Sequence, residues 1–433
     1  MPASIVQPQS DVRIRSLLAE RRPGHSLPAS FYTSDEVFDL DLEAIFGQHW
    51  IFVASEAEIR EPGDYVTVDV GRNSLVVIRD DDENVQVLRN VCRHRGARIL
   101  EPGCGSVGNL VCGYHQWTYR PDGDLVWAAS AADDFDKSGY GLGKVAFRSI
   151  AGLIYVNLSE HPNDDIDAIA EIVEPYFDQH QIRRTKVAAQ VDLIEEGNWK
   201  LTMENNRECY HCDNHPELGC TYFITWGYPE DKIPPHLQET HERYLAAEAE
   251  LEEKCLARGL HYKGVEQLDT RPMGFRVQRE ALDGEGESYS MTGARLVQKL
   301  LGDFDDAKLG RLSMHTQPNF WCHFMADHAI TFAVLPIAPG RTLVRTTWLV
   351  HEDAREGIDY NVNDLTYVWR ATNDQDAAFV ALAQKGVTDP GYVPGPYVPS
   401  EYQVDAFCNW YVDQVDAYLD GATAAHIDGE NVA

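Results

Sequence analysis

Two short cysteine–histidine pairs restrict the first third of the chain more than any other feature. Cys92 and His94 form the first pair, and Cys112 and His115 form the second. Residues 95–111 separate the two pairs. Turn-forming glycines accompany both pairs, and runs of β-type residues surround them: WIFVAS, DYVTVDV, SLVVIRD, VQVLRN and GLIYVNL. We therefore expect a small antiparallel β domain, from about residue 47 to 160, whose loops present these side chains to a metal.

The donor set allows two kinds of metal site. Two thiolates and two imidazoles suit a [2Fe-2S] cluster with cysteines on one iron and histidines on the other, which raises the reduction potential relative to an all-cysteine cluster. The alternative is a structural zinc site, because Zn²⁺ binds the same donors. Zinc fingers usually pair CxxC with HxxxH, whereas each pair here is mixed, so the spacing favours the cluster.

A second group of metal-binding residues lies in ENNRECYHCDNH, residues 204–215. GNWKL leads into this segment and predicts that it continues as a helix, on which Glu208, His211 and His215 would lie within roughly a 60° arc. One helical face would then offer a carboxylate and two imidazoles, as a metal site or as an unusually polar packed face. Cys209 and Cys212 have CxxC spacing and are expected to be packing residues.

The rest of the chain predicts an α+β fold. Helical patterns are present in DDIDAIAEIVEPYFDQHQI, residues 234–258, residues 363–385 and FCNWYVDQVDAYL. HAITFAVLPIAPGRTLVRTTWLVHE reads as a hairpin with its turn at APGR. We expect an N-terminal segment, residues 1–46, that packs on the second domain, then the β domain of 47–160, then a second domain of 161–433.

Composition excludes several classes of partner. The chain has 433 residues, 44% of them hydrophobic, a net charge of −32 and a pI near 4.7. Nucleic acid and anionic membrane surfaces would be repelled, whereas a cationic or zwitterionic small molecule remains compatible. No apolar run reaches about 18 residues, and the N-terminus lacks the apolar core of a secretory signal, so we expect a cytoplasmic protein. Its nine cysteines are then expected to be reduced.

The motifs resemble those of a known family. The two pairs, within CRHRGARI and CGYHQWTYRPDG, resemble the Rieske domain of Rieske non-haem iron oxygenases, and ENNRECYHCDNH resembles the histidine motif of their mononuclear iron site. The resemblance implies a Rieske β domain in the N-terminal half and a helix-grip-like catalytic domain with a central antiparallel sheet and flanking helices. It also implies that the two pairs hold a Rieske [2Fe-2S] cluster and that His211 and His215 bind Fe(II).

The resemblance also implies a third iron ligand and an electron route. Asp376 in VWRATNDQDAAFVALAQKG matches the position of the family's aspartate ligand, with Gln384 some eight residues later; Asp374 is the alternative, about 200° away around a helix. Glu208 would bridge a Rieske histidine and an iron histidine and carry electrons between subunits. Many family members have aspartate there, and glutamate is shared with oxygenases of quaternary amines.

The implied partners follow from this architecture. Electrons would pass from the cluster of one subunit to the iron of its neighbour in a head-to-tail homotrimer. NAD(P)H would act through a separate flavin and iron-sulfur reductase, because the one GxGxxG match, GCGSVG at residues 103–108, lies between the two pairs in the β domain and not between a strand and a helix, as a dinucleotide fingerprint requires. The competing functions are an aromatic-ring dioxygenase, which needs a larger apolar pocket, and a cluster-only electron carrier, which would leave the second domain without a role.

Several stretches, among them NWKLTMENNRECYHCDNHPEL and WRATNDQD, are most similar to oxygenase components that act on quaternary ammonium compounds. Glycine betaine is the favoured substrate, with stachydrine, carnitine and choline as alternatives. The implied reaction is O2-dependent hydroxylation of an N-methyl group, giving dimethylglycine and formaldehyde.

A pocket for such a substrate must hold a trimethylammonium group, which cannot donate a conventional hydrogen bond. Aromatic faces can do so by cation-π attraction. The candidate substrate contacts are Asn206, Tyr222, Phe223, Trp226, Phe320 and Trp321. The betaine carboxylate would need an arginine, a histidine or a backbone N–H, and the sequence leaves that donor open.

Overall fold

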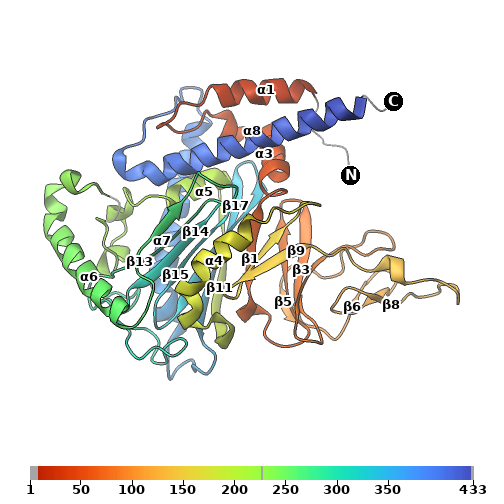
Figure 1. Cartoon of the computed structure of the whole chain (residues 1–433), viewed down its shortest axis with the longest axis horizontal. Coiled ribbons are helices and arrows are strands. Elements are labelled where there is room, and N and C mark those ends of the chain that lie inside the picture. Colours follow the sequence, from red (N-terminus) through yellow and green to blue (C-terminus); the bar gives the residue numbers. More distant parts are fainter. Residues whose placement is uncertain (1–7, 226–227, 431–433) are drawn as a thin grey trace.

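The computed structural model describes residues 8–225 and 228–430, so Trp226 lies outside the described residues. The small domain contains three antiparallel sheets (Figure 1). Their strand orders are β1-β10-β9, β4-β3-β2-β5 and β6-β7-β8. The bounds are β1 Trp50–Ser55, β2 Asp64–Val70, β3 Asn73–Arg79, β4 Val85–Arg89, β5 Cys104–Ser106, β6 Leu110–Val111, β7 Thr118–Tyr119, β8 Leu125–Trp127, β9 Ala146–Ile150 and β10 Leu153–Asn157.

A seven-stranded antiparallel sheet forms the centre of the large domain, in the order β11-β17-β16-β15-β14-β13-β12. Its strands are β11 Thr185–Glu195, β12 Val265–Gln267, β13 Phe275–Glu280, β14 Arg311–Thr316, β15 Phe320–Phe324, β16 Ala329–Ala338 and β17 Arg341–His351. The predicted hairpin is confirmed as β16 and β17. Together with the flanking helices, this sheet confirms the predicted α+β fold class.

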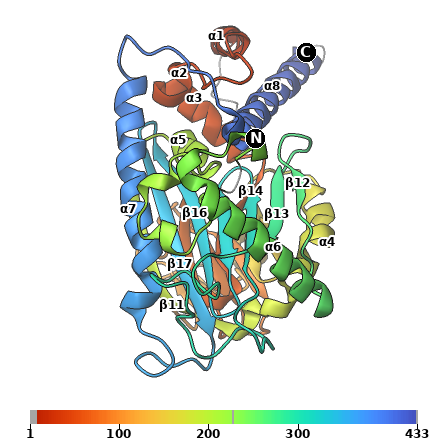
Figure 2. The same ribbon diagram turned by 90° about the vertical axis from the view of Figure 1, so that its left-hand side faces the viewer.

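The helices cover both faces of the large sheet (Figures 1 and 2). They are α1 Pro8–Ala19, α2 Ser30–Thr33, α3 Asp35–Leu40, α4 Asp165–Phe177, α5 Trp199–Asn206, α6 Gln238–Ala257, α7 Val362–Val387 and α8 Tyr402–Glu430. Apolar residues of α4 and of the strands β1 and β10 pack with one face of the sheet, whereas α5 and α7 lie against the other. The functional residues described below lie on this second face.

Side chains alternate between these faces along each strand, as the pleat requires. On β14, Leu312 and Met314 join the apolar core shared with α4, whereas Arg311, Ser313 and His315 point to the α7 side, where they line a cavity. All of these side chains are buried. One face of this part of the sheet is therefore a packed core, and the other is a buried polar surface.

The predicted helix through residues 204–215 is wrong. Helix α5 ends at Asn206, and only a single 3-10 turn, Cys212–Asn214, follows it. The Glu208 carboxylate accepts hydrogen bonds from the backbone N–H groups of Tyr210 and His211, and such local bonds compete with helix formation. Pro216 follows His215 and disfavours helical backbone there, where ψ is 89°.

The N-terminal segment joins the large domain through a buried charge network. Asp41, at the start of a π-helix (Asp41–Ile45), forms a fully buried ion pair with Lys200 of α5. Its carboxylate also accepts hydrogen bonds from Trp199 Nε1 at 2.9 Å and from the Tyr411 hydroxyl of α8 at 2.6 Å. Three segments that are distant in sequence thus share one carboxylate.

We expect Tyr411→Phe to lower the free energy of unfolding by about 2 kcal/mol, because it removes a buried hydrogen bond to a charged acceptor. Chemical denaturation measures this difference. Tyr402→Phe on the same helix is the matched control, since Tyr402 is exposed, and it should change stability by less than about 0.5 kcal/mol. Equal effects of the two substitutions would show that the Asp41 network does not anchor α8.

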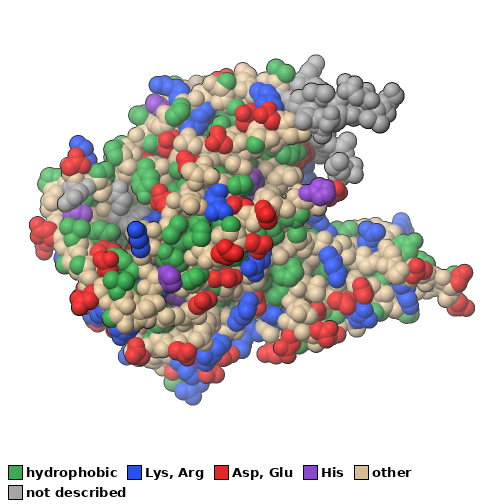
Figure 3. Space-filling model, in the orientation of Figure 1, with side chains coloured by type: hydrophobic (Ala, Val, Ile, Leu, Met, Phe, Trp, Pro, Cys, Tyr) green, Lys and Arg blue, Asp and Glu red, His purple; other side chains and the backbone are tan. Residues whose placement is uncertain are grey.

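The helices and the surface charges can be compared with the partners that the composition excludes. Among the described residues, no helix combines the length and the apolar character needed to cross a membrane. Asp and Glu side chains are spread over the face shown in Figure 3 and alternate there with Lys and Arg. The net charge of −32 therefore comes from many separate positions.

Candidate active site

Three side chains of the large domain converge on one point. His211 and His215 lie in the loop after α5, and Asp376 lies on α7. One potential ligand atom from each lies within 4.8 Å of the others, and Asp376 Oδ1 is 3.2 Å from Nε2 of each histidine. The alternative residue Asp374 is exposed on α7 and does not join this group. Two imidazoles and one carboxylate are the donor set of a non-haem iron site with open positions.

The outer nitrogen of each histidine is already engaged. His211 Nδ1 lies 2.5 Å from Glu208 Oε1, and His215 Nδ1 lies 2.5 Å from Gln375 Oε1. The Gln375 amide donates in turn to Glu217 at 3.1 Å. His215 Nε2 is buried 3.2 Å from Asp376 Oδ1 without the geometry of a hydrogen bond, as expected of two atoms that bind one metal. The residues present therefore fit a metal ion.

The electrostatics also favour a cation at this point. Burial lowers the pKa of His211, but Asp376 and Glu208 raise it more, to about 10. Burial raises the pKa of Asp376, while the two histidines hold it below its usual value. Without a metal, the acidic groups would hold a proton on His211, and a divalent cation can replace that proton.

The two cysteine–histidine pairs of the small domain lie on matching loops. In each, the cysteine carbonyl accepts a hydrogen bond from the N–H four residues later, at 3.0 Å for Cys92 and Gly96 and at 2.9 Å for Cys112 and Gln116. Both later residues have positive φ, 73° and 59°. The same local turn thus presents both pairs at one end of the domain.

The cysteines and histidines differ in exposure. Cys92 and Cys112 are 3% and 2% exposed, whereas His94 is exposed and His115 half-buried, with their ring centroids 4.6 Å apart. The Tyr119 hydroxyl lies 3.3 Å from Cys92 Sγ. Two buried thiols beside two more exposed imidazoles suit a Rieske cluster.

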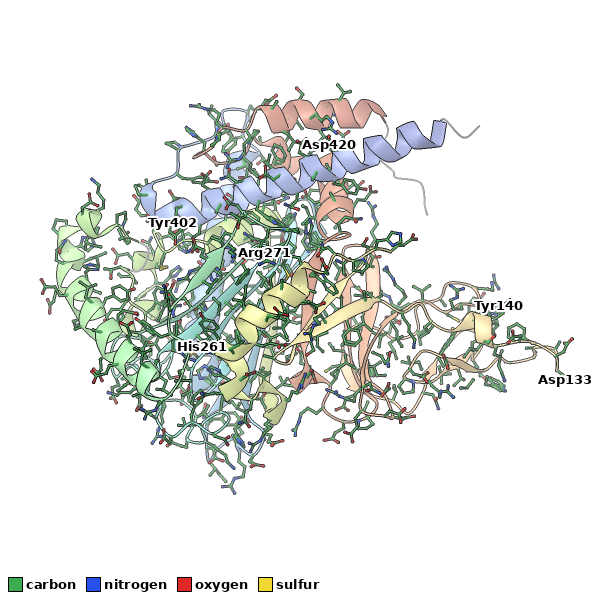
Figure 4. The ribbon with its side chains drawn as sticks, viewed as in Figure 1. Asp133, Tyr140, His261, Arg271, Tyr402 and Asp420 are labelled. Atoms are coloured by element: carbon green, nitrogen blue, oxygen red, sulfur yellow. A yellow bond between two sulfur atoms is a disulfide. The ribbon has the colours of Figure 1, made fainter. Side chains whose placement is uncertain are left out.

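The cluster loops and the triad lie in different domains and far from each other. Tyr140, whose ring centroid is 5.9 Å from that of Trp117 beside the loops, lies with Asp133 at the far end of the small domain in Figure 4. The triad lies between α5 and α7 in the large domain (Figures 1 and 2). Within one chain, the large sheet and most of the small domain separate the two sites.

A cavity extends from the triad to the polar face of the sheet. The loop after α5 and helix α7 form one end, and strands β13, β14 and β15 form the other. The lining residues are Asn205, Asn206, Glu208, Cys209, His211, Cys212, His215, Leu218, Tyr222, Arg276, Arg311, Ser313, His315, His323, Trp369, Thr372 and Asp376. The triad therefore opens onto a cavity with charged, polar and aromatic side chains in its wall.

Comparison with known families agrees with this geometry. A model of the Rieske [2Fe-2S] domain matches residues 49–137, and a model of the ring-hydroxylating alpha subunit catalytic domain matches residues 182–417. The chain belongs to the Rieske non-haem iron oxygenases. A Rieske cluster in the small domain and a mononuclear iron in the large domain, with O2 as co-substrate, come with this family.

Two oxygenase subunits are similar to the chain over nearly its whole length. This Rieske oxygenase is 38% identical to the glycine betaine monooxygenase oxygenase subunit of Chromohalobacter salexigens, over 95% of its own length and 91% of that protein. It is 37% identical to the Pseudomonas aeruginosa subunit of the same name, over 95% and 94%. Among solved structures, the quaternary ammonium Rieske monooxygenase CntA with L-carnitine shares the fold, with a TM-score of 0.65 at 21% identity over 92% and 98% of the two chains.

The predicted substrate contacts are only partly at the cavity. Asn206 and Tyr222 line it, but Phe223, Phe320 and Trp321 do not. Phe320 points to the core shared with α4, on the opposite face of β15, and Phe223 packs in the cluster of residues beneath α6. Trp321 stacks on Phe332 with ring centroids 4.8 Å apart. These three residues therefore lie outside the cavity, and a contact of any of the six with substrate stays a prediction.

The polar side chains in the cavity wall were not predicted from the sequence. Arg276, Arg311, Ser313, His315 and His323 lie on three neighbouring strands, with Arg276 opposite His315 and Ser313 opposite His323. The signal was present as alternation of polar and apolar residues in FRVQRE and RLSMHT. His323 completes this wall on β15.

The two loop cysteines also differ from expectation. Cys209 and Cys212 are buried, as packing residues would be, but they are joined in a disulfide, with their Cα atoms 4.9 Å apart. The turn that replaces the predicted helix brings them within bridging distance. Both cysteines line the cavity, so the bridge forms part of the wall beside the iron histidines.

Proposed function

We propose that this Rieske oxygenase hydroxylates an N-methyl group of glycine betaine, giving dimethylglycine and formaldehyde. The alignment of nearly the whole chain with glycine betaine monooxygenase oxygenase subunits carries this proposal. The charged side chains in the cavity wall support it, because a ring-hydroxylating enzyme needs a larger apolar pocket. Demethylation of stachydrine, or oxidation of carnitine or choline, is the alternative within the same chemistry.

Residue roles follow from the geometry. His211, His215 and Asp376 would hold the iron, which supplies O2 activation when bound. Glu208 and Gln375 would fix the orientation of the two imidazoles by accepting from Nδ1, so that each Nε2 points to the metal. The described aromatic residues that line the cavity include Trp369 and Tyr222, and the Arg311 guanidinium carbon lies 4.1 Å from the Tyr222 ring centroid.

The cluster would be held by Cys92, His94, Cys112 and His115, in the loops that match one another. Large apolar side chains are exposed around this tip: Val91 at 43%, Val111 at 48%, Tyr114 at 59% and Trp127 at 48%. Such residues suit burial against a second protein surface. They support a head-to-tail homotrimer, in which this tip meets the iron domain of a neighbour and Glu208 bridges the two histidines.

The remaining partner would be a reductase. Steady turnover requires electrons from NAD(P)H, which a separate flavin and iron-sulfur protein would deliver to the cluster. Both relatives are named oxygenase subunits, which fits an oxygenase component that acts with a second protein. Location in the cytoplasm remains a prediction from the sequence.

Formaldehyde release tests the function directly. The purified protein with cluster and iron loaded, a compatible reductase, NADH and O2 would be assayed with glycine betaine, stachydrine, carnitine and choline. We expect formaldehyde from glycine betaine at the highest kcat/KM, with one NADH consumed for each formaldehyde released. Absence of formaldehyde from every quaternary ammonium compound, while the reductase reduces the cluster, would refute the proposed function.

We expect Tyr119→Phe to lower the reduction potential of the cluster by tens of millivolts. A hydrogen bond from the Tyr119 hydroxyl to Cys92 Sγ would stabilise the extra negative charge of the reduced cluster, and a typical hydrogen bond is worth about 1 kcal/mol. Protein-film voltammetry measures the shift. Tyr140→Phe is the control, since Tyr140 packs near the loops through its ring alone among the contacts described; an equal shift there would refute the role of Tyr119.

A further inference from the structure

The cavity has two ends of different charge. Among the described residues that line it, Glu208 and Asp376 are the acids, and both belong to the triad end. The lining arginines, Arg276 and Arg311, lie at the opposite end on β13 and β14. When a divalent iron occupies the triad, its two positive charges balance the two carboxylates. The remaining lining charges are then those of the two arginines, whose carboxylate partners lie outside the lining.

The two arginines that line the cavity share carboxylate partners outside its lining. Arg276 and Arg311 both bind Glu280, at 2.9 Å and 2.7 Å, and all three are nearly completely buried. Arg276 also lies 3.4 Å from the partly exposed Glu266. The Arg311 guanidinium receives further support from the Tyr289 hydroxyl at 2.8 Å. These pairs hold the two guanidinium groups rigidly at the cavity wall.

A third buried guanidinium adds positive charge behind this wall. Arg207 is 1% exposed and donates to two amide oxygens, Asn206 Oδ1 at 2.7 Å and Gln317 Oε1 at 3.3 Å. No carboxylate pairs with it in the described part of the chain. Burial and the nearby Arg276 lower its pKa to about 9. A buried cation without an anion is costly, and a bound anion would relieve that cost.

Hydrogen-bond donors at the cavity wall lack protein acceptors. Arg311 Nε, His315 Nδ1 and Trp369 Nε1 are buried, make no hydrogen bond in the protein, and belong to residues that line the cavity. Burial and the charges of Arg207 and Arg276 hold the pKa of His315 well below its ordinary value. His315 is therefore neutral and can donate one N–H without adding a charge.

We propose that Arg276, Arg311 and His315 form a carboxylate-binding site that orients a zwitterionic substrate with its trimethylammonium group toward the iron. This inference rests on the proposed function and specifies how the substrate is selected. A carboxylate would accept the unused N–H groups and offset the charge of the nearby Arg207, which has no carboxylate partner among the described residues. The positive end would also repel the ammonium group, which leaves the triad end as its position. Choline, which has a hydroxyl group instead of the carboxylate, would lose this contact.

Arg276→Gln is the test variant. It removes one charge while Glu280 keeps Arg311 as its partner. Arg279→Gln is the matched control, because Arg279 is an equally buried arginine on the same strand, but it faces away from the cavity and donates to the Leu309 carbonyl. Both variants would be prepared as the metal-loaded protein and checked for cluster absorbance and oligomeric state.

The binding probe is 3,3-dimethylbutanoate, which has the shape and carboxylate of glycine betaine but no positive charge and no N-methyl group. Isothermal titration with the wild type should show binding, and 3,3-dimethylbutanol should bind at least tenfold more weakly. Arg276→Gln should weaken binding of the acid by about 30-fold, as expected for a charge-assisted contact, whereas Arg279→Gln should change it by less than about threefold. The kcat/KM ratio of glycine betaine to choline should fall by a similar factor in Arg276→Gln alone.

The outcomes separate the two proposals. If the acid probe binds and Arg276→Gln weakens it, but no formaldehyde is released from any substrate, the carboxylate site stands and the proposed function fails. If glycine betaine is demethylated and Arg276→Gln leaves both the probe affinity and the substrate ratio unchanged, the carboxylate site is refuted. If Arg276→Gln fails to fold, His315→Leu and His315→Gln replace it as test variants. Loss of probe binding in His315→Leu with retention in His315→Gln would support the site. Equal probe binding by the two variants would refute it.

Discussion

Replacement of Asp376 by alanine should reduce formaldehyde release by more than about 1000-fold, because two neutral imidazoles alone hold Fe(II) weakly and leave its charge unbalanced. Asp376 Oδ1 lies 3.2 Å from Nε2 of both His211 and His215, so it closes the triad from a separate helix. The small domain does not depend on this residue. Cluster absorbance and its reduction by dithionite should therefore remain unchanged, while the iron content falls by the mononuclear ion.

Asp374→Ala is the matched control for this experiment. It removes the same charge from the same helix two residues earlier, but the Asp374 side chain is exposed. Its turnover and iron content should equal those of the parent protein. If Asp374→Ala lost iron and Asp376→Ala retained it, the ligand assignment would be reversed. Retention of full turnover by Asp376→Ala would refute the triad altogether.

The local metal motifs could be read from the sequence because their ligands are close in the chain. In both cysteine–histidine pairs, one short turn fixes the geometry, so sequence spacing nearly determines structure. His211 and His215 were also identified, but for a partly wrong reason: they converge through a turn, not through a helical face. Local hydrogen bonds to Glu208 and the proline after His215 override the helix, and both features were visible in the sequence.

Contacts that depend on strand register could not be predicted in the same way. Phe320 and His323 both belong to the motif NFWCHF, yet a three-residue offset on a strand places them on opposite faces. Composition alone does not tell which face meets the cavity. The arginine end of the cavity combines residues of separate strands that become neighbours only through the sheet order β15-β14-β13. The alternation of polar and apolar residues could have predicted each strand. It could not have predicted which strands are neighbours in the sheet.

Replacement of Glu208 by glutamine should slow turnover by about 100-fold while both metal sites stay loaded, because an outer carboxylate that orients a ligand contributes up to this amount. Glu208 Oε1 accepts from His211 Nδ1, and its second oxygen accepts from the backbone of the same loop. Glutamine can keep one of these contacts but has no negative charge. It therefore cannot accept from both the iron histidine and the partner's cluster histidine as the carboxylate of the proposed bridge would. The cluster should still be reduced at the parent rate, and its reoxidation in the presence of substrate and O2 should become slow.

Asp213→Asn separates this effect from a general loss of charge in the loop. Asp213 lies between the two iron histidines in sequence, is exposed and pairs with His236 at 3.1 Å, so its removal should leave reoxidation of the cluster unchanged. A Glu208→Gln protein that turns over at the parent rate with both metals present would refute the bridge. A slow Glu208→Gln protein whose cluster is reoxidised at the parent rate would place Glu208 after electron transfer, in the orientation of His211 alone. Slow reoxidation in Glu208→Gln, together with an unaffected Asp213→Asn, is the combination that assigns the electron route between subunits to this single carboxylate.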